Sequence, residues 1–214
     1  MPKGLFVTFE GGEGAGKTTQ IKAIKDALEA RGLTVVTTRE PGGTAGAEAI
    51  RALLVSGETS RWDVTTELLL ATAARRDHVV RVIAPALEQG AVVLCDRFVH
   101  STLAYQGGRG AVTDEDVRNL HALAIGSLWP DITFIFDLDP DVAAQRSAAR
   151  DGANQGRFEK MDPAFHSHLR DRFMALASQD DVCQLVDAAA PVGDVTETIL
   201  TALSPLLDEV GNGG

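Results

Sequence analysis

Residues 5–20 read LFVTFEGGEGAGKTTQ, a short apolar run that leads through a glycine-rich loop into a helical pattern. The loop matches the pattern G-x-x-x-x-G-K-[ST] from Gly11 to Thr18. Glycines in such a loop let backbone amides turn toward phosphate oxygens, and the N-terminus of the next helix adds partial positive charge. The stretch therefore predicts a strand, a nucleoside triphosphate-binding loop and a helix, in that order.

The loop and the first helical turn supply the residues expected to bind ATP, the donor: Gly11, Gly12, Glu13, Gly14, Ala15, Gly16, Lys17, Thr18 and Thr19. Among them, Lys17 is expected to reach the β- and γ-phosphates, and Thr18 to offer its hydroxyl to Mg²⁺. GTPases, partition-type ATPases and small-molecule kinases all share this loop. The chain has no Asn-Lys-x-Asp segment for guanine, and it has no lysine at the start of the loop, so a kinase is favoured.

Five short apolar runs alternate with longer helical patterns along the chain. The runs are Leu5–Phe9, Leu33–Thr38, Ala91–Cys95, Ile132–Leu138 and Val182–Val186. They are apolar on successive residues, as strands covered on both faces are. We predict a P-loop three-layer α/β/α fold around a central parallel five-stranded sheet, as one domain over residues 1–214. Such sheets bind ligands at the carboxyl ends of their strands.

Composition narrows the class of partner. The net charge of −10 argues against a general nucleic-acid binder, which needs a basic face. No apolar run is long enough for a signal peptide or a membrane span, so we expect a cytoplasmic protein with no membrane partner. Cys95 and Cys183 are too few for a disulfide framework or, by spacing, a zinc site, and we expect both to be buried and reduced.

Three arginines stand at or near the expected ends of strands or in the helices that follow. Arg39 comes directly after one apolar run, Arg97 comes one residue after another, and Arg75 lies in a helical segment. An arginine fork can hold a phosphate in two directions at once, which suits a monophosphate that must be aligned for in-line attack. The pattern therefore indicates a second, anionic substrate.

Three segments in this order resemble bacterial thymidylate kinases: residues 9–20 (FEGGEGAGKTTQ), residues 38–44 (TREPGGT) and residues 96–107 (DRFVHSTLAYQG). The resemblance covers nearly the whole chain. It implies transfer of the γ-phosphoryl group of ATP to thymidine monophosphate, with Mg²⁺, in a homodimer. Two alternatives stay open: another P-loop nucleotide or small-molecule kinase, and a nucleotide-dependent switch protein.

The resemblance also implies residue roles at the acceptor. Arg39 and Arg97 would hold the acceptor phosphate, and Arg75 would reach the carbonyl edge of thymine. Ser101 or Thr102 would meet the ring from the other side.

Further roles concern the sugar and the metal. Tyr105 would pack beneath the deoxyribose, and Glu159 would lie near that sugar. Glu13 would lie near the 3′-hydroxyl and the transferring phosphate, and Asp96 would orient a magnesium-bound water.

Catalysis of phosphoryl transfer needs a cation beside the moving group. Lys17 and Arg97 are expected there with Glu13, but residues 12–15 contain no arginine. Residues 146–160 read as a lid, and Arg150 and Arg157 are the candidates in it for the catalytic cation, with the choice between them open.

One position departs from the family pattern. Four residues before the thymine-reading arginine the family has an aromatic residue that stacks on the base, and this chain has Ala71. Either a neighbour such as Phe98 or Leu70 fills the space, or base selectivity differs. The five histidines show no ligand spacing or paired acid in the sequence.

Overall fold

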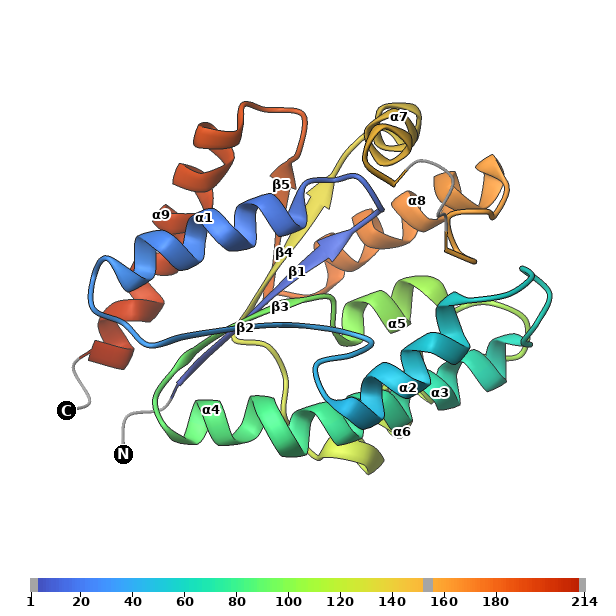
Figure 1. Ribbon diagram of the computed structural model, residues 1–214, viewed down its shortest axis with the longest axis horizontal. Coiled ribbons are helices and arrows are strands. Elements are labelled where there is room, and N and C mark those ends of the chain that lie inside the picture. Colours follow the sequence, from blue (N-terminus) through green and yellow to red (C-terminus); the bar gives the residue numbers. More distant parts are fainter. Residues whose placement is uncertain (1–3, 152–155, 212–214) are drawn as a thin grey trace.

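The computed structural model describes residues 4–151 and 156–211 and contains a five-stranded parallel sheet with the order β2-β3-β1-β4-β5 (Figure 1). The strands are β1 (Leu5–Gly11), β2 (Val35–Arg39), β3 (Val92–Asp96), β4 (Ile132–Asp137) and β5 (Cys183–Asp187). All five expected strands are present, so the α/β class and the parallel five-stranded sheet are confirmed.

The helical elements are α1 (Lys17–Glu29), α2 (Ala45–Val55), α3 (Val64–His78), the π-helical turn η1 (Val79–Ile83), α4 (Ala84–Glu88), α5 (Val99–Tyr105), α6 (Asp114–Ile125), α7 (Pro140–Asp151), α8 (Pro163–Gln179) and α9 (Val192–Gly211). Figure 1 shows α3, η1 and α4 as one continuous rod. The expected cap before α6 is a capping box, in which Thr113 and Asp116 bond each other's backbone amides. None of the described helices is both long and apolar enough to cross a membrane.

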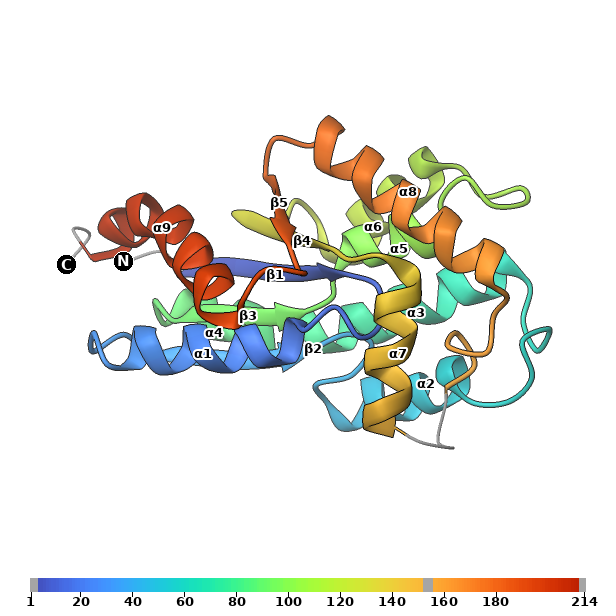
Figure 2. The same ribbon diagram turned by 90° about the horizontal axis from the view of Figure 1, so that it is seen from above.

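Two apolar cores lie on the two faces of the sheet, because successive strand residues point to opposite sides. Val7 and Phe9 pack with α1 and α9, whereas Phe6 packs with the helices of the other face. Figure 2 shows the sheet between these layers. The second face is covered by the α3-η1-α4 rod together with α5, α6 and α8. Both cysteines are buried and free, as expected.

The carboxyl ends of the inner strands meet at one edge of the sheet. β1 lies between β3 and β4 at the centre of the sheet. The strand order runs outward from it in both directions, to β2 on one side and to β5 on the other. The register places Asp96 beside Phe9 on one flank and beside Arg39 on the other. Topology therefore brings the glycine-rich loop and two of the expected arginines to the same edge.

Candidate active site

The glycine-rich loop joins β1 to α1 in a backbone path that needs glycine. Gly14 and Gly16 have φ values of 73° and 90°. A Cβ added at Gly14 would lie 2.4 Å from the carbonyl oxygen of Ala143, in the first turn of α7. The loop is therefore pressed between the sheet and α7, with its end continuing into the N-terminus of α1.

Lys17 folds back over this loop. Its Nζ donates to the carbonyl oxygens of Gly11 at 3.1 Å and Gly12 at 2.8 Å. Burial, and next the nearby charge of Arg97, lower the pKa of Lys17. The ammonium is thus held by neutral carbonyls at a place where a phosphate would satisfy it better.

Thr18 and Asp96 form a pair of oxygen donors beside the loop. The Thr18 hydroxyl donates to Oδ2 of Asp96 at 3.3 Å. Oδ1 of Asp96 is buried and finds no hydrogen-bond partner within the described part of the chain. Hydroxyl and carboxylate oxygens are ligands that Mg²⁺ prefers, directly or through water. These two residues therefore fit the expected magnesium position.

Three arginines from three elements line the groove beside the loop: Arg39, Arg51 and Arg97. Arg97 has φ 70°, a strained backbone for a non-glycine residue, and its Nη2 donates to Glu13 at 2.7 Å. Arg39 is half-exposed and pairs with Glu48 at 2.9 Å. Burial, and then the charge of Arg39, lower the pKa of Arg51. The groove holds a concentration of positive charge within an acidic chain.

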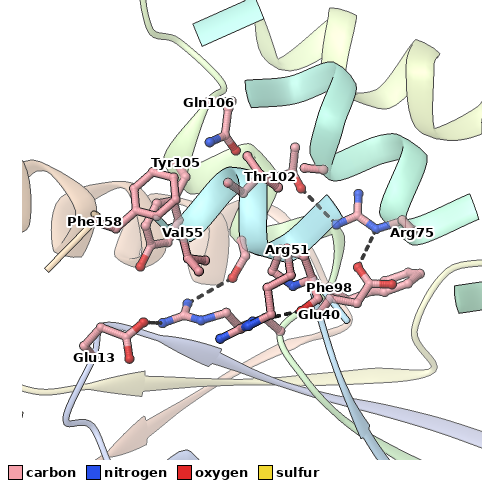
Figure 3. Close-up of a pocket in the computed structure, with 15 residues that line it drawn as sticks. Glu13, Glu40, Arg51, Val55, Arg75, Phe98, Thr102, Tyr105, Gln106 and Phe158 are labelled. Carbon is pink, nitrogen blue, oxygen red and sulfur yellow. Dashed lines mark hydrogen bonds and ion pairs between the residues drawn. The ribbon is translucent and has the colours of Figure 1, made fainter. Parts of the chain in front are cut away.

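A second pocket opens from the groove (Figure 3). In that view Glu13 and Arg75 lie at opposite ends, and Tyr105 and Phe158 lie along one side. The pocket is also lined by Ala71, Ser101 and Thr102 among others. Arg51 and Arg97 line both spaces, so a molecule in the pocket can reach the groove with one end.

Arg75 is fixed at the far end of this pocket by a buried network. Its Nε donates to Glu40 at 2.8 Å, and its Nη2 donates to the Thr102 hydroxyl at 2.9 Å. Glu40 also contacts His78 at 3.0 Å, so this histidine does have a paired acid, contrary to the reading of the sequence. Nη1 of Arg75 finds no partner among the described residues. Arg75 is thus held in one orientation at the wall of the pocket, with one donor still without a partner.

Arg157 does not line the groove or the pocket. Its side chain is 1% exposed and donates to the carbonyl oxygens of Leu54 and Thr59, each at 2.9 Å, and to a carboxylate oxygen of Glu67. The guanidinium expected beside the transferring phosphate is therefore an anchor instead. It fixes the chain just before Phe158, whose ring lies 5.3 Å from that of Tyr105.

The other residues expected in the lid lie in different surroundings. Glu159 accepts from the amide of Gly156 at 3.0 Å and lines a third cavity, between α7 and α8, that Gly12 and Glu13 of the glycine-rich loop also line. The backbone of Arg150 is part of α7, but its side chain lies outside what the structure describes. The first part of the expected lid, from Arg146, is helical.

Sequence reasoning missed Arg51, Glu40 and Phe158 as lining residues. Arg51 had a detectable signal. It stands in the stripe Ala47, Arg51 and Leu54, at helical spacing, whose two apolar members are buried. An arginine in a buried stripe is unusual enough to mark a site. Glu40 stands in the quoted segment TREPGGT, but its role and that of Phe158 depend on partners far along the chain.

Comparisons with known proteins agree with this geometry. The sequence model of the thymidylate kinase family matches residues 9–199. A thymidylate kinase of Rhizorhabdus wittichii is 49% identical over 97% of this chain and 100% of its own length, and one of Caulobacter vibrioides is 50% identical over 93% and 95%. The crystal structure of thymidylate kinase from Ehrlichia chaffeensis superposes with a TM-score of 0.75 at 34% identity, covering 94% of this chain and 100% of that one. The chain belongs to the thymidylate kinase family.

Proposed function

We propose that this chain, a kinase that phosphorylates thymidine monophosphate with ATP, carries out the transfer where the phosphate groove meets the Arg75 pocket. ATP occupies the groove with its phosphates on the loop from Gly11 to Thr19. Thymidine monophosphate occupies the pocket with its base toward Arg75 and its phosphate toward Arg97. The arginines that line both spaces support this arrangement, because the acceptor phosphate must lie at the junction.

On the donor side, Lys17 exchanges its two carbonyl partners for oxygens of the β- and γ-phosphates. The loop amides and the N-terminus of α1 hold the same phosphates from the other side. Thr18 and, through water, Asp96 would hold Mg²⁺, which would neutralise charge on the donor phosphates. The unsatisfied Oδ1 of Asp96 supports this role.

On the acceptor side, Arg97, Arg39 and Arg51 align the monophosphate. One of its oxygens attacks the γ-phosphorus, and the bond from that phosphorus to the β–γ bridging oxygen breaks, so ADP leaves. No general base is needed because the attacking oxygen is already anionic. Glu13, bonded to Arg97, orients that guanidinium and borders the sugar. Ser101, Thr102 and Tyr105 complete the pocket, with Tyr105 leaving little space for a 2′-hydroxyl.

One observation carries the choice of acceptor. Arg75 lines the end of the pocket away from the phosphate groove, and its buried Nη1 has no partner among the residues that the structure describes. The 4-carbonyl oxygen of thymine can accept a hydrogen bond from that Nη1. Cytosine has an amino group at this position, which would place two hydrogen-bond donors against each other. Thymidine monophosphate should therefore react far better than cytidine or adenosine monophosphate, with deoxyuridine monophosphate in between.

The test is a coupled assay of ADP release with each monophosphate in turn and with none. Preference for thymidine monophosphate supports the base assignment. Equal rates with all four monophosphates would overturn it and leave the kinase reaction in place. Hydrolysis unaffected by any monophosphate would instead indicate a nucleotide-dependent switch.

We propose that the two candidate arginines within residues 146–160 have different roles. Arg157 anchors the end of the segment and keeps Phe158 at the pocket, while Arg150 supplies charge to the transferring group. We expect Arg150→Ala to lower turnover and leave stability unchanged. Arg157→Ala should lower the free energy of unfolding, because it leaves Glu67 buried without this partner. Equal loss of turnover with unchanged stability in both variants would contradict this division.

A homodimer is proposed through the face formed by α3, η1 and α6, which pack together. Leu69, Val80 and Leu123 are large apolar side chains there that are 53%, 47% and 82% exposed. Leu123→Asp should shift light-scattering mass from dimer to monomer, whereas Leu185→Asp, on β5, should leave it unchanged.

We also propose that the chain forms one domain and that it lies in the cytoplasm, where ATP and thymidine monophosphate are made and used.

A further inference from the structure

Three side chains that the kinase site does not use meet near the amino ends of β4 and β5. They are His100 on α5, Asp180 at the end of α8 and Cys183 at the start of β5. One potential ligand atom from each lies within 4.8 Å of the other two. The spacing of the cysteines argued against a zinc site, but His100 and Asp180 are 80 residues apart in sequence, so only the fold could assemble this cluster.

The cluster is separate from the phosphate groove. Cys183 pairs in register with Thr133, the second residue of β4, and the carboxyl end of β4 is Asp137. None of the three residues lines the phosphate groove or the acceptor pocket, so a ligand at this cluster would lie outside both spaces.

His100 has the environment of a metal-binding imidazole. Its ring is fully buried, and Nε2 lies 3.2 Å from Oδ2 of Asp180. At the back of the ring, Nδ1 lies 3.3 Å from the Thr133 hydroxyl, which is itself 2.8 Å from that of Thr8. A hydrogen bond at one ring nitrogen fixes the ring and directs the other nitrogen at the metal. Nε2 is the nitrogen that faces Asp180.

Asp180 and Cys183 come from a single turn with two residues between them, which is a spacing common for paired zinc ligands. The amide of Cys183 donates to the carbonyl oxygen of Asp180 at 2.9 Å and holds the turn closed. Asp180 is 16% exposed, which gives an ion a path from solvent at the turn between α8 and β5, visible in Figure 2. Burial, and next the charge of Asp180, raise the pKa of Cys183 to about 12, so the thiol is the form present until a metal ion displaces its proton.

We propose that His100, Asp180 and Cys183 bind one zinc-class divalent transition metal ion, with water as the fourth ligand. A tetrahedral zinc site with bonds of about 2.0–2.3 Å places its ligand atoms about 3.3–3.8 Å apart. The His100–Asp180 distance of 3.2 Å is just below this range, and the sulfur, within 4.8 Å of both, needs to move by about 1 Å. On binding, the S–H bond of Cys183 breaks, its proton passes to solvent, and a sulfur–metal bond forms.

Imidazole, carboxylate and thiolate together favour zinc or cobalt over magnesium, which prefers oxygen ligands. The ion would tie α5 to β5. Because α5 carries Ser101, Thr102 and Tyr105 in the acceptor pocket, the expected effect is to stiffen that wall of the pocket. The binding itself does not depend on the kinase assignment.

The test is a titration of the chelator-treated full chain with Co²⁺, in buffer that contains excess Mg²⁺. We expect one equivalent to produce a near-ultraviolet thiolate-to-cobalt band and the intense visible bands of tetrahedral cobalt, both displaced by Zn²⁺. Cys183→Ser should abolish the near-ultraviolet band. Cys95→Ser, at the other buried cysteine, should keep it.

A second measurement uses stability. Zn²⁺ at saturating concentration should raise the unfolding midpoint on the order of 5 °C in the wild-type chain and in Cys95→Ser, and not in Cys183→Ser. The absence of the thiolate band in the wild-type titration would overturn the proposal whatever the folding of the variants. A band that persists in Cys183→Ser would overturn it equally.

Discussion

The acceptor pocket and the phosphate groove form the two ends of the site, the acceptor end and the donor end. At the acceptor end, Arg75 is almost fully buried and already has a carboxylate partner, Glu40, at 2.8 Å. At the donor end, Lys17 is buried to a similar degree, but among the described residues its ammonium donates only to carbonyl oxygens. One end is therefore assembled before any ligand arrives, while the other holds a charge that a ligand would satisfy. We therefore expect substitutions at the acceptor end to lower stability and substitutions at the donor end to lower turnover.

The largest effect is expected from breaking the acceptor-end pair. Glu40→Ala leaves Arg75 buried without its carboxylate and should lower the free energy of unfolding by about 3–5 kcal/mol. Glu48→Ala is the matched control, since it removes the partner of Arg39 at nearly the same distance but on the surface. It should cost about 1 kcal/mol or less. Urea unfolding of both variants measures the difference, and similar losses would refute the contrast.

At the donor end the same kind of change should act on turnover instead. Lys17→Met removes a cation aimed at the phosphates and should lower turnover by about 10²–10³-fold. Stability should stay unchanged or rise, because burial lowers the pKa of Lys17 and so opposes its charge in the free protein. Lys25→Met, on the exposed side of α1, should change neither quantity. A strongly destabilised Lys17→Met would show that both ends are built alike.

Sequence reasoning reached the donor end almost completely and the acceptor end only in part. Gly11 to Thr18 is a local pattern, and its strand and helix follow from neighbouring residues. The partners that fix the acceptor end are distant: Glu40 is 38 residues from His78, and Glu67 is 90 residues from Arg157. No local pattern distinguishes an arginine that enters the transfer site from one buried against carbonyl oxygens of another helix.

The pH dependence of stability should also come from the acceptor end. His121 packs edge-on against Phe98, with ring centroids 5.7 Å apart, and burial, followed by the charge of Arg75, lowers its pKa to about 4. In the unfolded chain this histidine takes up a proton near its ordinary pKa of about 6.5, before the folded state does. Stability is therefore lost as the pH falls from about 6.5 to 4.

Between pH 7 and pH 5 this histidine should cost about 2 kcal/mol. His121→Gln keeps a donor for the carbonyl oxygen of Leu128 but cannot take the proton. The loss over this pH range should be smaller in the variant than in the wild type by that amount, measured by urea unfolding at both pH values. Equal losses would mean that another group carries the dependence.

The smallest expected effect tests how complete the acceptor end is. Ala71 lines the pocket one helical turn before Arg75, so a ring at that position would lie over the base that Arg75 reads. Ala71→Phe should add about 1 kcal/mol of stacking, seen as an approximately fivefold lower KM for thymidine monophosphate at unchanged turnover. Lys22→Phe, at an exposed position of α1, should change neither constant. A raised KM in Ala71→Phe would contradict this expectation. It would mean that Leu54 and Val55 already occupy the space beside the base, so that the added ring overpacks the pocket.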